Sequence, residues 1–147
     1  MKALVQRVSE AGVIIGGESV AEIGKGYLVL FGVAVGDAPE AADKLAERLI
    51  RLRIFEDENG KTNKSITDVG GDIIVVSQFT LYADTAHGNR PGFSGAARPE
   101  TAIPAYERFV SALRAHLGES RVGTGRFGAD MKVHLVNDGP FTVELSL

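Results

Sequence analysis

The sequence predicts a strand-rich α+β fold: a single domain over residues 1–147, with β-barrel-like sheets and two main helices. Short apolar runs bounded by glycine recur at both ends of the chain, which is typical of strands joined by turns. Two other segments carry apolar side chains at helical spacing. No linker, repeat or low-complexity tract divides the chain, and 147 residues are enough to bury a substantial core.

The first third of the chain is predicted to form strands. Residues 3–8 alternate between inward and outward positions, and residues 13–15 are apolar. The Gly16-Gly17 pair is a hairpin turn signal, so residues 19–23 are expected to return alongside. Residues 27–35 form an almost unbroken apolar run, which predicts a central strand.

A first helix is predicted to begin near Asp37. This aspartate can act as the N-cap, and Glu40 stands at the capping-box position three residues later. Leu45, Leu49 and Leu52 follow at helical spacing, so they would form the buried face of the helix.

The second half of the chain predicts a further strand, a long loop and a second helix. Residues 72–81 alternate as a strand whose side chains face opposite ways. Residues 84–99 form a loop rich in glycine, proline and arginine, and ordered loops of this length tend to be functional. Apolar residues at helical spacing predict a helix over residues 100–117, with Gly118 as its stop signal.

The chain is expected to end in two strands, over residues 131–136 and 141–147, that flank a tight turn at Gly139-Pro140. This turn contains no side chain that could carry out chemistry. Its two residues shape the backbone instead, because glycine is conformationally free and proline fixes its own φ.

Composition limits the classes of function. A formal net charge of −3 and a pI of about 5.6 argue against broad binding to a nucleic-acid backbone, but allow a few local cations to grip a single-stranded end. The absence of cysteine excludes disulfides and thiolate metal sites. No apolar run approaches the ~20 residues of a membrane span. These features favour a cytoplasmic protein with no membrane partner.

Few side chains have the spacing of a catalytic or metal site. The three histidines (His87, His116 and His134) lack metal-ligand spacing and are interpreted as structural or surface residues, as is the acidic run at residues 56–58. The glycine-rich segment at 123–128 lacks the context of a dinucleotide loop. These patterns therefore give no sign of a metal site or a dinucleotide loop.

Two kinds of residue remain as candidates. Thr80 carries a hydroxyl at the end of an apolar strand, but a threonine nucleophile needs a base and none is adjacent in sequence. Arg90 and Arg98 each precede a proline, which holds their backbone extended. Arginine suits phosphate or carboxylate recognition, and a solvated loop arginine is the alternative for both.

Three sequence blocks together resemble a known family. They are Ser-Gln-Phe-Thr-Leu at 77–81, Asn-Arg-Pro-Gly-Phe at 89–93 and Asn-Asp-Gly-Pro-Phe-Thr at 137–142. In this order, they are similar to the signature blocks of D-aminoacyl-tRNA deacylases of the bacterial D-Tyr-tRNA deacylase type. Further similarity at residues 6–8, 22–26, 53–55 and 124–131 extends the resemblance along the chain. Gly92 departs from the serine that the family often has.

This resemblance implies an activity and an assembly. It implies a homodimer, with its active sites at the subunit interface, that hydrolyses the ester between a D-amino acid and the terminal adenosine of tRNA. Glycine mischarged on tRNA-Ala is also implied as a substrate, and no cofactor is required. The peptide bond between Gly139 and Pro140 would be cis and would reach into the partner's pocket, where its backbone would exclude L-amino acids.

The resemblance also implies roles for individual residues. Gln78 and Arg90 would orient the pocket, and Phe79 and Phe93 would form its walls or pack against the adenine. For such an activated ester, the backbone N–H groups of Phe79 and Thr80 would stabilise the oxyanion and the ribose 2′-hydroxyl would help to activate water. Thr80 would not be a covalent nucleophile, because no base accompanies it. The predicted catalytic residues are Phe79, Thr80 and Gln78; the predicted substrate-binding residues are Ser77, Arg90, Phe93, Asn137, Gly139 and Pro140.

Two alternative functions stay open from the sequence. One is a threonine-dependent hydrolase of small esters, which would not need the 2′-hydroxyl. The other is a non-catalytic dimer that binds tRNA ends and would protect D-aminoacyl-tRNA rather than hydrolyse it.

Overall fold

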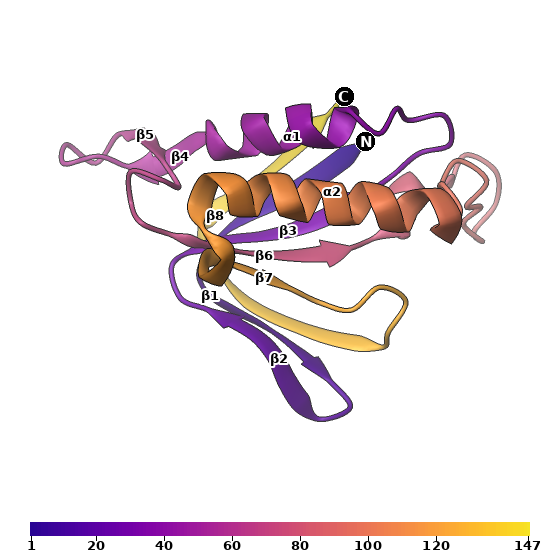
Figure 1. Ribbon diagram of the computed structural model, residues 1–147, viewed down its shortest axis with the longest axis horizontal. Helices are drawn as coiled ribbons and strands as arrows, with labels where there is room; N and C mark the ends of the chain where they lie inside the picture. The colour runs from indigo at the N-terminus through magenta and orange to yellow at the C-terminus, as the bar shows by residue number, and fades with distance from the viewer.

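One mixed sheet of six strands forms the frame of the computed structural model, which describes residues 1–147 (Figure 1). Its strand order is β2-β1-β3-β6-β7, with β8 also paired to β1, and β4 and β5 form a separate hairpin. In chain order the elements are β1 (Lys2–Ile15), β2 (Glu18–Ile23), β3 (Gly26–Gly32), α1 (Ala41–Ile50), β4 (Arg53–Glu56), β5 (Thr62–Ser65), β6 (Asp72–Ser77), the short 3-10 helix η1 (Phe79–Tyr82), α2 (Pro99–Leu117), the short 3-10 helix η2 (Glu119–Arg121), β7 (Val122–Thr124) and β8 (Met131–Ser146).

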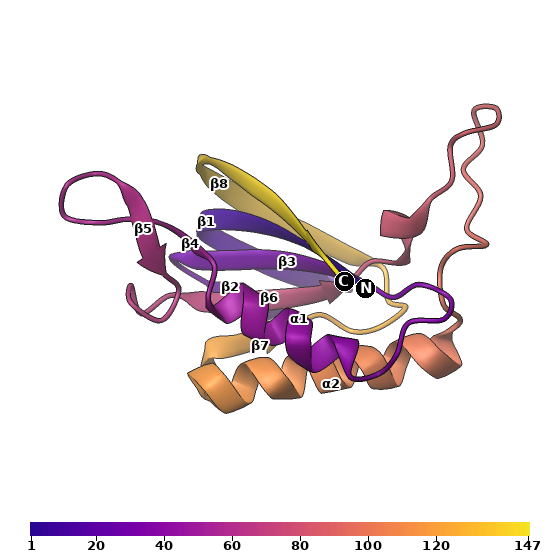
Figure 2. The ribbon, with the colours of Figure 1, turned by 90° about the horizontal axis from the view of Figure 1, so that it is seen from above.

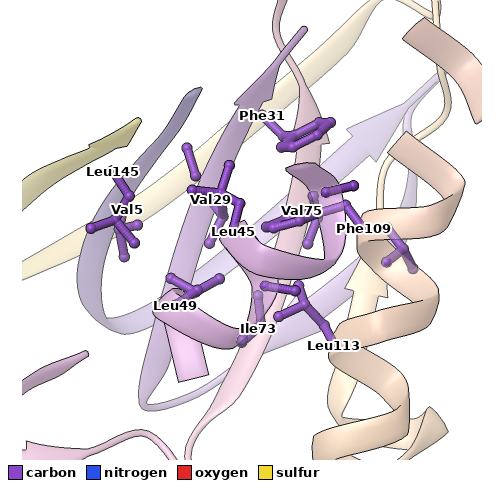
Figure 3. Close-up of a cluster of buried hydrophobic side chains, with 14 of the residues drawn as sticks. Val5, Val29, Phe31, Leu45, Leu49, Ile73, Val75, Phe109, Leu113 and Leu145 are labelled. Carbon is purple, nitrogen blue, oxygen red and sulfur yellow. The ribbon is translucent and has the colours of Figure 1, made fainter. Parts of the chain in front are cut away.

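The main core lies between one face of the sheet and the two helices. Figure 2 shows α1 and α2 side by side along this face. Alternate residues of β3 and β6, such as Val29 and Val75, meet Leu45 of α1 and Phe109 of α2 (Figure 3). Phe31 stacks on Phe109, with ring centroids 4.4 Å apart. The helical periodicity in the sequence thus predicted the buried faces of both helices, except that Leu52 lies beyond the end of α1 and is only half-buried.

A second, smaller core lies on the opposite face of the sheet. Its six buried members alternate with those of the main core along the central strands: Val8, Ala11, Val13, Leu28, Ile74 and Val76. No helix covers this face. Instead, the far half of β1 curls together with β2 and the first half of β8, and their half-buried apolar side chains close over it. The sheet is therefore nearly closed and barrel-like, as predicted.

The predicted turn at Gly139-Pro140 is wrong, because β8 runs through both residues as one long strand paired with β1. Gln6 pairs with Thr142 and Val8 pairs with Asn137, so β8 carries extra residues at this point and bulges away from β1. The two predicted final strands do not pair with each other, since each half of β8 pairs with a different half of β1.

The bulge lies where β8 changes from one core to the other. Val143 and Leu145 belong to the main core, whereas Val133 and Leu135 pack against the second one. A regular strand would keep residues of the same parity on one face. Bulges bend strands and are common at barrel corners, so glycine and proline here form a corner rather than an end.

The structure contains no cis peptide bond. The bond between Gly139 and Pro140 is therefore trans, and the expectation of a cis bond is wrong. Trans is the favoured isomer of an X-Pro bond by about 0.5–1 kcal/mol. The continuous β8 strand accommodates it with a positive φ of 119° at Gly139.

Several element boundaries differ from the prediction. The strand predicted over residues 27–35 ends at Gly32, and the segments predicted at 3–8 and 13–15 form one strand, β1. The helix α1 begins at Ala41, because the Asp37 carboxylate accepts the N–H of Ala34 at 2.7 Å and pairs with the Met1 amino group at 2.7 Å instead of capping. The strand β6 ends at Ser77 rather than continuing to residue 81. The helix α2 was predicted to within one residue. Neither α1 nor α2 is long and apolar enough to cross a membrane.

Candidate active site

A cavity of about 650 Å³ opens at the carboxyl ends of the parallel strands β3 and β6. Ligands commonly bind at this edge of parallel strands. Most of its walls are apolar, and they come from four places: the ends of β3 and β6, the 93–97 segment, the first turns of α2, and the segment leading into β8. The lining includes Phe31, Gly32, Val76, Ser77, Gln78, Phe79, Phe93, Ala97, Ala102, Tyr106, Phe127 and Met131.

The 77–80 segment turns sharply at the cavity. The backbone N–H of Gln78 still bonds to the Phe31 carbonyl at 2.7 Å, and the chain then enters η1. The N–H groups that open a helical turn have no acceptor within it. Those of Phe79 and Thr80 make no backbone hydrogen bond outside η1. Two free N–H donors therefore follow one another at the cavity edge.

The Thr80 side chain does not line the cavity, and its hydroxyl accepts a hydrogen bond from Nε2 of Gln78. No histidine, lysine or carboxylate group bonds to it. Activation of a hydroxyl nucleophile requires such a base within hydrogen-bond reach. The geometry thus gives Thr80 no activating partner.

Two aromatic rings stand at the mouth of the cavity. Phe79 is 54% exposed and Phe93 is 40% exposed, which is unusual for large apolar side chains outside an interaction surface. Their ring centroids lie 5.0 Å apart in an edge-on arrangement. Aromatic faces of this kind can pack against a nucleobase.

Tyr106 fixes the rear wall of the cavity. Its ring is only 8% exposed, and its hydroxyl donates to the Val75 carbonyl at 2.9 Å. The same carbonyl accepts the N–H of Gly125 at 3.2 Å, which ties β6 to the segment leading into β8. Burial raises the pKa of the Tyr106 phenol to about 12, so it remains a neutral donor. Sequence inspection missed this residue because its helical spacing indicated only a core position.

Arg90 stands on an exposed arm rather than in the cavity wall. The arm is closed at its base by two backbone hydrogen bonds between Asp84 and Gly92, of 2.7 and 2.8 Å. In Figure 2 the segment between β6 and α2 extends away from the body of the molecule at the right. Phe93 follows this base, so the arm leads directly into the cavity mouth.

The bulge of β8 forms a second, separate group of predicted site residues. Asn137 donates from Nδ2 to the carbonyls of Arg7 and Phe141, at 2.9 and 3.0 Å, and so closes the bulge across its base. Arg7 is only 4% exposed, and its side chain lies beneath the bulge. It donates to the carbonyls of Asp138, at 2.9 Å, and Ile54.

The guanidinium of Arg7 also explains the glycine in the bulge. A Cβ atom at position 139 would collide with this group, and the positive φ there disfavours other residues. The guanidinium stacks on Phe141, 4.4 Å from its ring centroid, and pairs with the Asp138 carboxylate at 3.4 Å. Arg7 occupies an inward position of β1, and a charge at such a position is a signal that could have identified it.

The predicted site residues thus fall into two groups. Ser77, Gln78, Phe79 and Phe93 line the cavity, whereas Thr80 follows in η1 and Arg90 lies on the exposed arm. The bulge residues Asn137, Gly139 and Pro140 do not line the cavity of their own chain. No three His, Asp or Glu side chains gather in a way that could hold a metal ion.

Comparison with known proteins identifies the family. The family model described as D-Tyr-tRNA(Tyr) deacylase matches residues 4–146. A D-aminoacyl-tRNA deacylase of Symbiobacterium thermophilum is 58% identical over 143 residues, covering 97% of this chain and 93% of the relative. One of Alteromonas mediterranea is 56% identical over 147 residues and covers both chains fully.

Solved structures agree with this fold. A protein described as c-Myc DNA Unwinding Element Binding Protein superimposes with a TM-score of 0.95 at 42% identity, over 100% of this chain and 99% of the other. A probable eukaryotic D-amino acid tRNA deacylase has a TM-score of 0.84 at 19% identity, which shows similarity of the fold alone. This chain therefore belongs to the D-Tyr-tRNA(Tyr) deacylase family and is an enzyme of the hydrolase class.

Proposed function

We propose that this enzyme hydrolyses the ester that joins a D-amino acid, or glycine mischarged on tRNA-Ala, to the terminal adenosine of tRNA. The observation that carries this proposal is the cavity. It is lined by Ser77, Phe79 and Phe93, which belong to the sequence blocks shared with the family, and free backbone donors lie at its edge. An aminoacyl ester on a nucleoside needs such a combination: apolar walls for base and side chain, and donors for the reacting carbonyl.

The chemistry is proposed to depend on positioning rather than on a nucleophile. The N–H groups of Phe79 and Thr80 would donate to the oxyanion that develops on the ester carbonyl, and Gln78 would hold the Thr80 side chain. The neighbouring ribose 2′-hydroxyl would help to activate water. The geometry supports direct attack by water over attack by a threonine nucleophile, because the Thr80 hydroxyl has no base.

Selection for the D configuration is proposed to come from the backbone at Gly139-Pro140 of a second copy of the chain. In the single chain these residues stand outside the cavity on an exposed bulge, yet they are held firmly from below by Arg7 and Asn137. A main-chain wall that enters the partner's cavity would clash with an L-side chain and leave room for hydrogen or a D-side chain. The proposed working unit is therefore a homodimer with shared sites.

The test is a comparison of matched D-Tyr-, L-Tyr- and Gly-charged tRNAs, each with and without the terminal 2′-hydroxyl. The wild-type enzyme is expected to cleave the D-Tyr and Gly esters, to spare the L-Tyr ester, and to lose activity without the 2′-hydroxyl. Pro140→Ala should raise cleavage of the L-Tyr ester. Full discrimination by this variant would refute the backbone wall, and an aminoacyl-Thr80 adduct in mass spectrometry would refute the proposed chemistry.

A non-catalytic tRNA-end-binding dimer is not favoured for a member of this hydrolase family. Binding to duplex DNA is not favoured either. With a formal net charge of −3, the chain is poorly suited to the many phosphate contacts that duplex binding requires.

A further inference from the structure

Three arginines adjoin the segments that line the cavity, each in a different part of the chain. Arg98 immediately precedes the lining residue Pro99, Arg126 immediately precedes the lining residue Phe127, and Arg90 belongs to the arm that leads into Phe93. All three are exposed. None has a carboxylate within ion-pair distance, whereas seven other lysines and arginines of the chain do.

Nearby carboxylates are mostly occupied by other groups. Asp130, which lines the cavity, pairs with Lys132 at 2.9 Å. Asp84 accepts the N–H of Ala86 at 2.9 Å. Glu100 lies in the first turn of α2, where a negative charge is stabilised by the helix dipole. The three guanidinium groups are therefore left available to an anionic ligand, in a chain whose overall charge is negative.

The backbone beneath these arginines is held in place. Arg98 is extended, with φ −71° and ψ 160°, as expected before proline. The N–H of Ala129 bonds to the Arg126 carbonyl at 3.2 Å and closes a turn there. An anchored backbone reduces the entropy lost when such a side chain binds, and the planar guanidinium can bind a phosphate with two hydrogen bonds.

We propose that Arg98 and Arg126, together with Arg90, bind the phosphates of the last nucleotides of the tRNA acceptor end. This inference rests on the proposed function. If the esterified terminal nucleoside occupies the cavity, the strand that carries it must leave through the mouth, past the segments that carry these arginines. Recognition would then depend on a short, single-stranded backbone and not on the duplex, which suits a protein of negative net charge.

The experiment compares two substrates that share the reacting ester: D-Tyr-tRNA and the D-tyrosyl ester of adenosine, which has no phosphate. The double variant Arg98→Gln/Arg126→Gln is measured beside Arg51→Gln. Arg51 is an equally exposed arginine at the end of α1, which contributes nothing to the cavity. The readouts are kcat and KM for both substrates, and the salt dependence of kcat/KM for the tRNA.

The double variant should raise KM for the tRNA and leave the phosphate-free ester unaffected. The slope of log kcat/KM against log salt should become less steep by about 0.7 for each lost contact with single-stranded nucleic acid, whereas Arg51→Gln should match the wild type. An unchanged salt slope, or an equal loss on both substrates, would overturn the inference. Failure of the wild type to cleave either substrate would instead refute the proposed function on which the inference depends.

Discussion

The cavity at the ends of β3 and β6 is walled by packed apolar side chains, whereas the bulge of β8 is held by hydrogen bonds from Arg7 and Asn137. The cavity is lined by residues of one chain. The bulge is exposed and does not contribute to that cavity. Tight packing fixes the position of a site, whereas hydrogen bonds to main-chain carbonyls fix the path of a projecting backbone.

This difference implies that the two regions control different properties. Changes to the cavity should affect every substrate alike, because they move the groups that surround the ester. Changes beneath the bulge should affect the choice between D and L substrates, because they move the proposed wall without moving the oxyanion donors. The next two predictions test this separation.

The largest effect is expected from Gly32→Val. A Cβ atom at position 32 would lie 3.0 Å from the Gln78 carbonyl oxygen and 3.2 Å from the Tyr82 ring, so the valine must displace the 77–82 segment. Because a displacement of about 1 Å can cost roughly 100-fold in rate, kcat/KM should fall by about this factor for the D-Tyr and Gly esters equally.

The matched control is Gly24→Val. The nearest atom to a Cβ atom there is the Ser9 carbonyl oxygen at 4.0 Å, so the side chain has room. This control should keep most of its activity, and circular dichroism should show both variants folded. An active Gly32→Val enzyme, or a loss confined to one acyl group, would contradict the assignment of the 77–82 segment to the reaction itself.

An intermediate effect, on selectivity and stability, is expected from Arg7→Met. The variant keeps an unbranched apolar stem but leaves the carbonyls of Asp138 and Ile54 without their donor. An unsatisfied buried acceptor costs about 1–3 kcal/mol, which urea unfolding should detect. The ratio of D-Tyr to L-Tyr hydrolysis should fall about tenfold, equivalent to ~1.4 kcal/mol, while Gly hydrolysis changes little.

Arg7→Lys provides the comparison for charge alone, because lysine keeps the charge but lacks the planar fork that reaches two carbonyls. It should fall between the wild type and Arg7→Met in both selectivity and stability. Uniform loss of activity on all three esters in Arg7→Met would show that the bulge and the cavity are not independent.

The same contrast explains which parts of the fold could be predicted from sequence. The hairpin at Gly16-Gly17 and the buried faces of both helices follow from local periodicity, and the structure has them. The role of Gly139-Pro140 depends on pairing with Gln6 and Val8, more than 120 residues away along the chain. Local sequence carries the signal for an interruption there, but not for whether the chain reverses or only bends.

Two further element boundaries could not be predicted from sequence, for a similar reason. Phe79 continues the alternation of β6, so nothing local marks the end of the strand at Ser77. Asp37 has the sequence context of an N-cap, but its carboxylate is taken by Ala34 and the Met1 amino group. Both outcomes are set by tertiary contacts that override local preference.

The candidate site divides in the same way. Conspicuous motifs located Ser77, Phe79 and Phe93 at the cavity. Tyr106 resembled an ordinary core position, and the charge of Arg7 at an inward position of β1 was a signal that did not indicate its partners. Each makes its contribution through a bond to a main-chain carbonyl, at 2.9 Å in both cases, that is distant in sequence. Spacing along the chain cannot indicate such an acceptor.

The smallest effect is expected from removing the hydroxyl group of a buried tyrosine. Tyr106, at the cavity, donates to the Val75 carbonyl at 2.9 Å, and Tyr27, near Arg7, donates to the Leu52 carbonyl at 3.2 Å. Burial raises the pKa of both phenols above the value of about 10 of an unfolded tyrosine, to about 12 for Tyr106. Burial likewise raises the pKa of Tyr82 to about 12.

The sign of the pH effect follows from this order of pKa values. Between pH 10 and pH 12 the unfolded chain loses its phenolic protons before the folded chain does, so the unfolded state is stabilised. The stabilisation from the neutral phenols is complete below pH 10 and is lost as pH rises toward 12. The free energy of unfolding should therefore decrease with pH across this range.

Tyr106→Phe should reduce that dependence without abolishing it, because Tyr27 and Tyr82 still contribute. At pH 8 the variant should lose about 1 kcal/mol for the missing hydrogen bond, and its unfolding free energy should then fall less steeply above pH 10. Urea unfolding at pH 8, 10 and 11 measures both quantities. A pH dependence identical to that of the wild type would mean that the Tyr106 phenol ionises as it would in water, and its bond to Val75 could not then hold the rear wall of the cavity.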